Sequence, residues 1–149
     1  MKDSSREVLK ITELTTEFRI PEGVVPAVNR LSFNLHARET VCLVGESGCG
    51  KSVTALSIMR LIPDPPGRIV GGAIEFDGQN LLTLSGEEMR RIRGSKIAMI
   101  FQEPMTSLNP LFTVGDQIAE VYLEHTTQDR SSAWKSVEAI LGRVGIPEP

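Results

Sequence analysis

Residues 45–52 read Gly45-Glu46-Ser47-Gly48-Cys49-Gly50-Lys51-Ser52 and match the pattern G-x-x-x-x-G-K-[ST]. Small residues at these positions let successive backbone N–H groups turn inward around a polyanion, and the lysine adds an ammonium group beside them. The helix expected to start near Gly50 contributes the positive end of its dipole. The stretch therefore predicts a loop that binds the phosphates of a nucleotide.

Individual side chains of this loop have separate predicted roles. Lys51 would place its ammonium against the β- and γ-phosphates, and the Ser52 hydroxyl would be a ligand of the Mg²⁺ that bridges them. Cys49 is expected to be a small filler whose amide faces phosphate. A reactive thiol is the alternative, because helix N-termini lower the pKa of cysteine. For the whole motif, the alternative is a glycine turn without a ligand.

The residues around the loop predict the strand and helix that this motif requires. Residues 40–44 are continuously apolar and run straight into the glycines, which is typical of a strand buried on both faces. Residues 51–61 contain no Gly or Pro and carry Val53, Leu56 and Met59 at helical spacing, which predicts a helix. The prolines of residues 63–67 would end that helix.

Upstream of the loop, the pattern predicts an antiparallel β region. Residues 8–18 begin with an apolar and polar alternation at residues 9–12, residues 31–35 alternate again, and Pro21-Glu22-Gly23 between them has turn chemistry. After this turn, Val24, Val25 and Val28 predict a further strand that returns from it.

Downstream of the loop, short-range signals predict the remaining elements. Ile74 and Phe76 alternate into Asp77-Gly78, which predicts a hairpin, and Ser85 with Glu88 three residues later predicts a helix start. Residues 96–101 are a second candidate for a buried strand. Beyond the loop at residues 103–113, helical periodicity predicts two amphipathic helices, marked by Ile118, Val121 and Tyr122, and by Trp134, Val137, Leu141 and Val144.

Composition excludes several classes of protein. The chain has 149 residues, of which 40% are hydrophobic and 23% charged, as in an ordinary globular domain rather than a disordered chain. The longest apolar run is residues 97–101, too short to cross a bilayer. The formal charge of −3 argues against nucleic acid as a partner. Two cysteines without metal-ligand spacing, together with no secretory h-region, predict a cytosolic protein.

A longer motif indicates which nucleotide-binding family this is. Residues 97–110, Ile-Ala-Met-Ile-Phe-Gln-Glu-Pro-Met-Thr-Ser-Leu-Asn-Pro, resemble the Q-loop of ABC transporter ATPases, in the form found in dipeptide and oligopeptide importers. Residues 112–118, residues 67–72 and the glycine loop resemble the same branch. The resemblance implies an α/β P-loop NTPase of the ABC type with an N-terminal antiparallel β region. It divides the chain into an ATP-binding core at 1–101 and a Q-loop with the start of a helical subdomain at 102–149.

The resemblance also assigns roles to matching residues. Gln102 would reach the Mg²⁺ and the attacking water, so the implied catalytic residues are Lys51 and Gln102, and the implied metal ligands are Ser52 and Gln102. Phe18 would stack on adenine, with an ordinary core phenylalanine as the alternative. The implied ATP-binding set is Phe18, Gly45, Glu46, Ser47, Gly48, Cys49, Gly50, Lys51, Ser52 and Val53.

The implied partners are membrane permease subunits and a second ATPase subunit. The permease would meet the loop after Gln102, and peptides would be bound by other subunits. The protein would then sit on the inner face of the cell membrane and energise peptide import.

Three family motifs are missing from this sequence: the Leu-Ser-Gly-Gly-Gln signature, the hydrophobic strand ending in Asp-Glu, and the switch histidine that follows them. The run at residues 84–88 begins Leu-Ser-Gly, but it precedes the Q-loop, whereas the family signature follows it. The two histidines, His36 and His125, both precede the position expected for the switch histidine. We therefore expect a chain cut before the signature, with weak ATP binding and negligible turnover. The alternatives are a short module that binds nucleotide and docks a membrane partner without hydrolysis, and another P-loop enzyme such as a small-molecule kinase.

Overall fold

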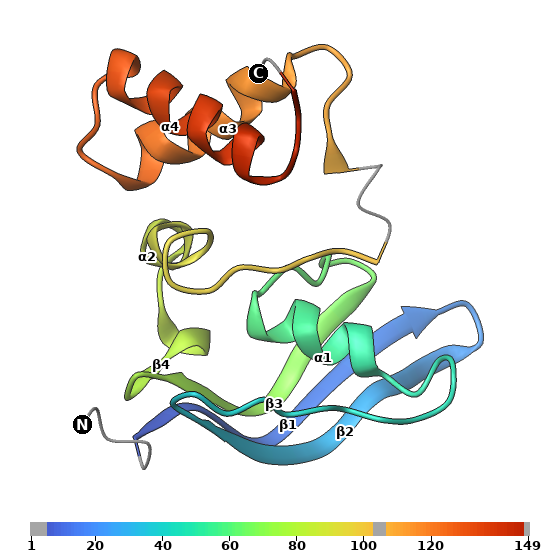
Figure 1. The fold of residues 1–149 in the computed structure, drawn as a ribbon. Coiled ribbons are helices and arrows are strands. Elements are labelled where there is room, and N and C mark those ends of the chain that lie inside the picture. The colour runs from blue at the N-terminus through green and yellow to red at the C-terminus, as the bar shows by residue number, and fades with distance from the viewer. Residues whose placement is uncertain (1–5, 103–106, 148–149) are drawn as a thin grey trace. The chain divides into compact units, whose positions relative to one another are not determined.

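The computed structural model describes residues 6–102 and 107–147, which form two compact units that meet in sequence between Met89 and Arg90 (Figure 1). The division predicted after Phe101 separates the ATP-binding core from the Q-loop and helical subdomain, which is a division by role and not by compactness. It stays a prediction. None of the described helices is long and apolar enough to cross a membrane. The two units are described separately below.

An antiparallel sheet of four strands dominates the first unit. Its order is β2-β1-β3-β4, with β1 at Glu7–Ile20, β2 at Gly23–His36, β3 at Gly67–Phe76 and β4 at Gln79–Asn80. The sequence predicted this antiparallel region, and the turn at residues 21–22 joins β1 to β2 as expected. The two strands predicted after the turn, around residues 24–28 and at 31–35, form one continuous strand, β2. Asp77 and Gly78 both have positive φ, 47° and 80°, which is the two-residue turn that joins strands of matching twist.

One short helix, α1 at Lys51–Ile58, lies against a face of this sheet (Figure 1). The buried core of this unit includes Ile11, Leu14 and Ile74, each at most 1% exposed. Burial of such aliphatic side chains is the main driving force for packing the unit.

The helix α1 ends three residues before the predicted end at Leu61. Arg60 takes φ 50° and its guanidinium donates hydrogen bonds to the carbonyl oxygens of Leu81 and Leu84, at 3.1 and 2.6 Å. The amide of Leu61 then bonds to the carbonyl of Leu56, which closes the helix in the manner of a glycine C-cap. A distant segment, the 3₁₀ turn η1 at Leu81–Thr83, thus fixes the end of α1.

Two helix starts in the chain follow the expected capping chemistry. Ser85 Oγ accepts from the Glu88 amide at 3.2 Å while the Glu88 carboxylate accepts from the Ser85 amide at 2.8 Å, so the predicted capping box opens α2 at Gly86–Ile92. In the second unit, Asp129 accepts from the Ser132 amide at 2.9 Å and opens α4 at Arg130–Arg143.

The second unit consists mainly of α4 and α3 at Val114–His125, the two helices that periodicity predicted. They pack together through small and branched residues: Ala119, Ala133 and Val137 are 4%, 0% and 1% exposed. Gly115 lies under the Trp134 ring, and a β-carbon there would come within 2.7 Å of it. The absence of a side chain at Gly115 lets the tryptophan cover the start of α3.

Two predictions of buried strands are wrong. Residues 40–44 form no strand, and Val44 is 94% exposed. Residues 96–101 contain only a single bridge, between Arg93 and Ile97, and Ile100 is 92% exposed. A parallel strand forms through hydrogen bonds to its neighbours, and the described part of the chain supplies no strand that pairs with either segment. The apolar residues of these two segments would favour burial in a sheet, but the described part of the chain does not bury them in one.

Candidate functional site: the glycine loop

The glycine loop leads from the exposed segment at residues 40–44 into α1. Gly48 and Gly50 take φ 83° and 91°, a left-handed conformation that side chains disfavour. The Cys49 amide bonds to the Glu46 carbonyl at 3.3 Å and makes the turn inside the loop. Helical bonding starts at Gly50, whose carbonyl accepts from the Thr54 amide at 2.8 Å.

Two contacts fix the position of the loop. A β-carbon at Gly50 would lie 2.1 Å from the carbonyl oxygen of Ala27, so Gly50 rests directly on the backbone of β2. A β-carbon at Gly45 would lie 2.5 Å from Sγ of Cys49, so the cysteine fills the space beside Gly45. The second contact agrees with the filler role predicted for Cys49. That the Cys49 amide faces phosphate stays a prediction.

The Lys51 ammonium lies inside the loop. Its Nζ donates to the carbonyl oxygens of Gly45 and Glu46, both at 2.7 Å, and to Cys49 Sγ at 3.4 Å. The amides of Lys51, Ser52 and Val53 have no acceptor among the described residues, as expected for the first turn of a helix without a side-chain cap. One cation and several free N–H groups are thus gathered at one point of the chain, an arrangement that suits a polyanion.

The other predicted site residues lie apart from the loop. Phe18 is half-buried at the end of β1, where its Cε1 would be 2.7 Å from a β-carbon at Gly67. That contact is ordinary packing of the ring edge and does not test stacking on adenine. Gln102 is exposed and belongs to the second unit, and the residues after it, 103–106, lie outside the described residues. The position of Gln102 relative to the glycine loop is therefore not tested, because the two lie in different units.

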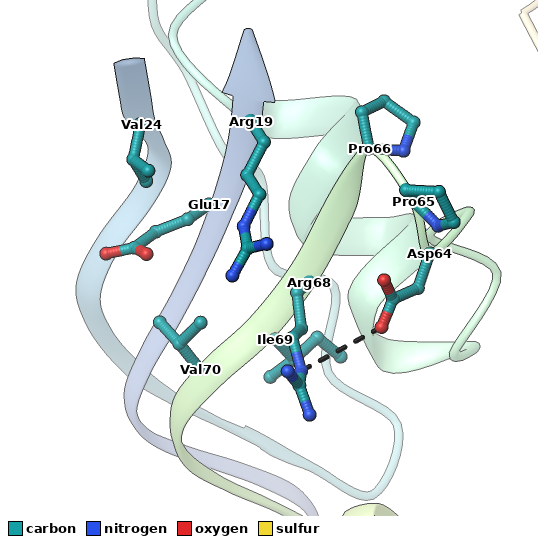
Figure 2. A pocket seen from close by; sticks show the side chains of 9 residues that line it. All are labelled: Glu17, Arg19, Val24, Asp64, Pro65, Pro66, Arg68, Ile69 and Val70. Atoms are coloured by element: carbon teal, nitrogen blue, oxygen red, sulfur yellow. Dashed lines mark ion pairs between the residues drawn. The ribbon is translucent and has the colours of Figure 1, made fainter.

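Two hollows in the first unit differ in character. One of about 320 Å³ lies between the loop and β2 and includes Cys49, Gly50 and Lys51 in its wall. Another, of about 450 Å³, contains none of the predicted site residues; Figure 2 shows Arg19, Arg68, Glu17 and Asp64 around it. Its two arginines are matched by two carboxylates, and Arg68 pairs with Asp64 at 3.8 Å. This charge balance makes it a poorer site for a triphosphate than the glycine loop.

Sequence reasoning missed the polar contact that ties α1 to the sheet. Of the residues at helical spacing, Met59 is 6% exposed, but Val53 and Leu56 are only half-buried. Thr54 and Ser57 are 3% and 0% exposed. Their hydroxyls bond to backbone carbonyls one turn earlier, which removes the cost of burying them. No pattern in the sequence distinguishes Thr16 from the neighbouring Thr12 and Thr15 as the polar partner on the strand.

Comparisons with known proteins agree with this geometry. The family model described as ABC transporter matches residues 28–148. The dipeptide transport ATP-binding protein DppD of Bacillus subtilis is 48% identical over 143 residues, which are 96% of this chain and 43% of that protein. The oligopeptide transport ATP-binding protein OppD of the same organism is 46% identical, over 95% of this chain and 40% of its own length.

Solved structures show the same fold. The dimeric ATP-binding cassette MJ0796 in a post-hydrolysis state bound to ADP and Pi has a TM-score of 0.80 at 22% identity, covering 94% of this chain and 58% of that one. The chain thus spans less than half the length of the two Bacillus subtilis proteins. The family match over most of its residues nevertheless shows that the chain belongs to the ABC transporter family.

Proposed function

We propose that this chain binds ATP with Mg²⁺ at the glycine loop and serves as the ATP-binding part of a peptide-importing ABC transporter. The observation that carries the proposal is the Lys51 ammonium held within the loop, beside amides that lack an acceptor in the described chain. The names of the two Bacillus subtilis relatives, which concern dipeptide and oligopeptide transport, support the choice of peptide import.

The residues present fit a nucleotide in the following way. Lys51 would exchange two carbonyl oxygens and a thiol for phosphate oxygens, which make stronger, charge-assisted hydrogen bonds. The amides of Lys51, Ser52 and Val53 would donate to the same phosphates. The exposed Ser52 side chain offers a hydroxyl oxygen to Mg²⁺, an ion that prefers oxygen ligands and keeps part of its coordination for substrate phosphates.

Removal of the ammonium tests this proposal. We expect Lys51→Ala to weaken binding of a fluorescent ATP analogue by about tenfold or more, because a hydrogen bond to a charged group contributes roughly 1.5–3 kcal/mol. The matched control is Lys135→Ala, which removes an exposed lysine of α4. Equal affinities for the two variants would contradict the proposed site.

We also propose that the region after Gln102 docks on a membrane permease. Leu111 and Phe112 are 85% and 60% exposed, and the Gln117 amide holds their loop by donating to the carbonyls of Asn109 and Phe112 at 3.0 and 3.2 Å. Exposed apolar residues in a loop that is fixed by hydrogen bonds are typical of a protein contact.

The double variant Leu111→Asp, Phe112→Asp tests this docking role. It should abolish cosedimentation with vesicles that carry the permease, whereas the control Leu123→Asp on α3 should not. Equal cosedimentation of the two variants would refute the docking role.

A second ATPase subunit, hydrolysis and a position on the inner face of the membrane belong to the same proposal. The family and the names of the two relatives, which concern transport and ATP binding, support these proposals. They concern a complete transporter rather than this chain alone.

A further inference from the structure

A buried hydrogen-bond relay links β1 to the first turn of α1. Thr16 Oγ1 and Ser57 Oγ lie 2.9 Å apart, and Ser57 Oγ donates to the Val53 carbonyl at 2.7 Å. Because the single Ser57 proton goes to Val53, Thr16 must donate to Ser57. Both residues are 0% exposed, so water does not compete for these bonds.

One end of this relay, Val53, belongs to the predicted ATP site, and the other end, Thr16, lies two positions from Phe18, which also belongs to that site. Phe18 follows Thr16 by two positions on β1, so both side chains lie on the same face of the strand. The β1–β3 register is regular from Thr16 to Phe18, opposite Ile69 to Gly67. Val53, at the other end, belongs to the first turn of α1, whose amides are free to bind phosphate. The relay thus joins the strand that carries the predicted base contact to the helical turn that carries the predicted phosphate contacts.

We infer that Thr16 and Ser57 are positioning residues that set the distance between Phe18 and the phosphate-binding turn, so that base and phosphates are bound cooperatively. The inference rests on the proposed function. A ligand that engages both ends gains affinity only when those ends are held at the right separation, and a rigid buried hydrogen bond holds them without an ordering cost upon binding. Neither residue would touch the nucleotide.

Thr16→Val is the variant that tests the relay. It replaces the hydroxyl by a methyl group of similar size, and Ser57 keeps its bond to Val53, so no donor is left unsatisfied. We expect affinity for inorganic tripolyphosphate to change by less than about twofold, and affinity for Mg-ATP to fall by about five- to tenfold. Thr16→Ser should restore the hydroxyl and the affinity. Thr12→Val, at an exposed position of the same strand, is the matched control.

A double-mutant cycle with Phe18→Ala separates positioning from a general loss of stability. Stacking of a base on an aromatic ring justifies an expected loss of about tenfold for Phe18→Ala in the wild-type background, and less than about twofold in the Thr16→Val background. Equal losses in both backgrounds would overturn the inference while leaving ATP binding intact. If Thr16→Val fails to fold by circular dichroism, the same cycle is measured with Ser57→Ala.

The two proposals fail in different ways. Wild-type protein that binds neither Mg-ATP nor tripolyphosphate contradicts the proposed function and the relay together. If the wild-type protein binds both ligands but the affinity losses of Phe18→Ala and Thr16→Val multiply in the double variant, only the inference about the relay is contradicted.

Discussion

Gly48 and Gly50 both need a positive φ, but only Gly50 also needs the space of the missing side chain. Alanine at either position should cost about 1–2 kcal/mol, because a residue with a β-carbon is strained in the left-handed region. Gly50→Ala must in addition displace the Ala27 carbonyl of β2, whereas a β-carbon at Gly48 meets nothing within 4 Å. We expect a further loss of ~1–3 kcal/mol for Gly50→Ala in urea unfolding. Equal losses for the two variants would show that the loop does not rest on β2.

Only part of the glycine loop's geometry could be predicted from the spacing of its residues. The spacing of Gly45, Gly50 and Lys51 predicted a loop with a lysine close to it, and the ammonium does lie inside the loop. The support of Gly50 by Ala27 depends on β2, and the relay through Ser57 depends on β1, and both partners lie more than 20 residues upstream in the chain. Contacts of that kind depend on tertiary packing, which no local pattern encodes.

At the scale of single elements, Asp129 gives α4 a dependence on pH. Hydrogen bonds from the Ser132 hydroxyl and then the Ser132 amide hold the pKa of this carboxyl below its ordinary value of 3.8. A carboxyl whose pKa is lower in the folded state stabilises the fold above its unfolded pKa, and that contribution is lost as the pH falls through the folded pKa.

The variant Asp129→Asn separates the charge from the cap. Asparagine caps helices about as well as aspartate but does not titrate in this range. Between neutral pH and about pH 3, the stability of the wild type should therefore fall more steeply than that of Asp129→Asn in urea unfolding. Parallel pH profiles would contradict the role of the Asp129 carboxylate.

Elements with local signals were predicted well, and elements that need distant neighbours were not. The hairpin at Asp77-Gly78 and the capping box of Ser85 and Glu88 carry their chemistry within four residues, and both formed as predicted. The end of α1 moved because Arg60 bonds to Leu81 and Leu84. The segment at residues 40–44 has the composition of a parallel strand, but composition cannot supply the strands that must pair with it.

At the scale of the whole molecule, the exposed strand-like segment at residues 40–44 makes the chain prone to associate. Val41, Leu43 and Val44 are 38%, 39% and 94% exposed in a stretch without regular secondary structure outside the sheet. Unpaired backbone groups next to apolar side chains are a template for pairing with another chain. We expect the apparent mass in sedimentation to rise with protein concentration.

Val44→Lys should reduce this association, because a charge on an exposed strand opposes edge pairing. Val121→Lys is the control, since Val121 is 52% exposed but lies on α3, where the backbone is already hydrogen-bonded. A wild-type protein that stays monomeric at every concentration and melts cooperatively would contradict this expectation.

We propose that the amides and the ammonium of residues 45–53 hold the polyphosphate of a nucleotide. Titration calorimetry of the wild-type chain measures this directly, with Mg-ATP in one experiment and adenosine in another. We predict saturable heat with Mg-ATP that is lost in Lys51→Ala, and no measurable heat with adenosine, because the charged phosphates supply most of the interaction. No heat with Mg-ATP, or equal heats for ATP and adenosine, would contradict the claim.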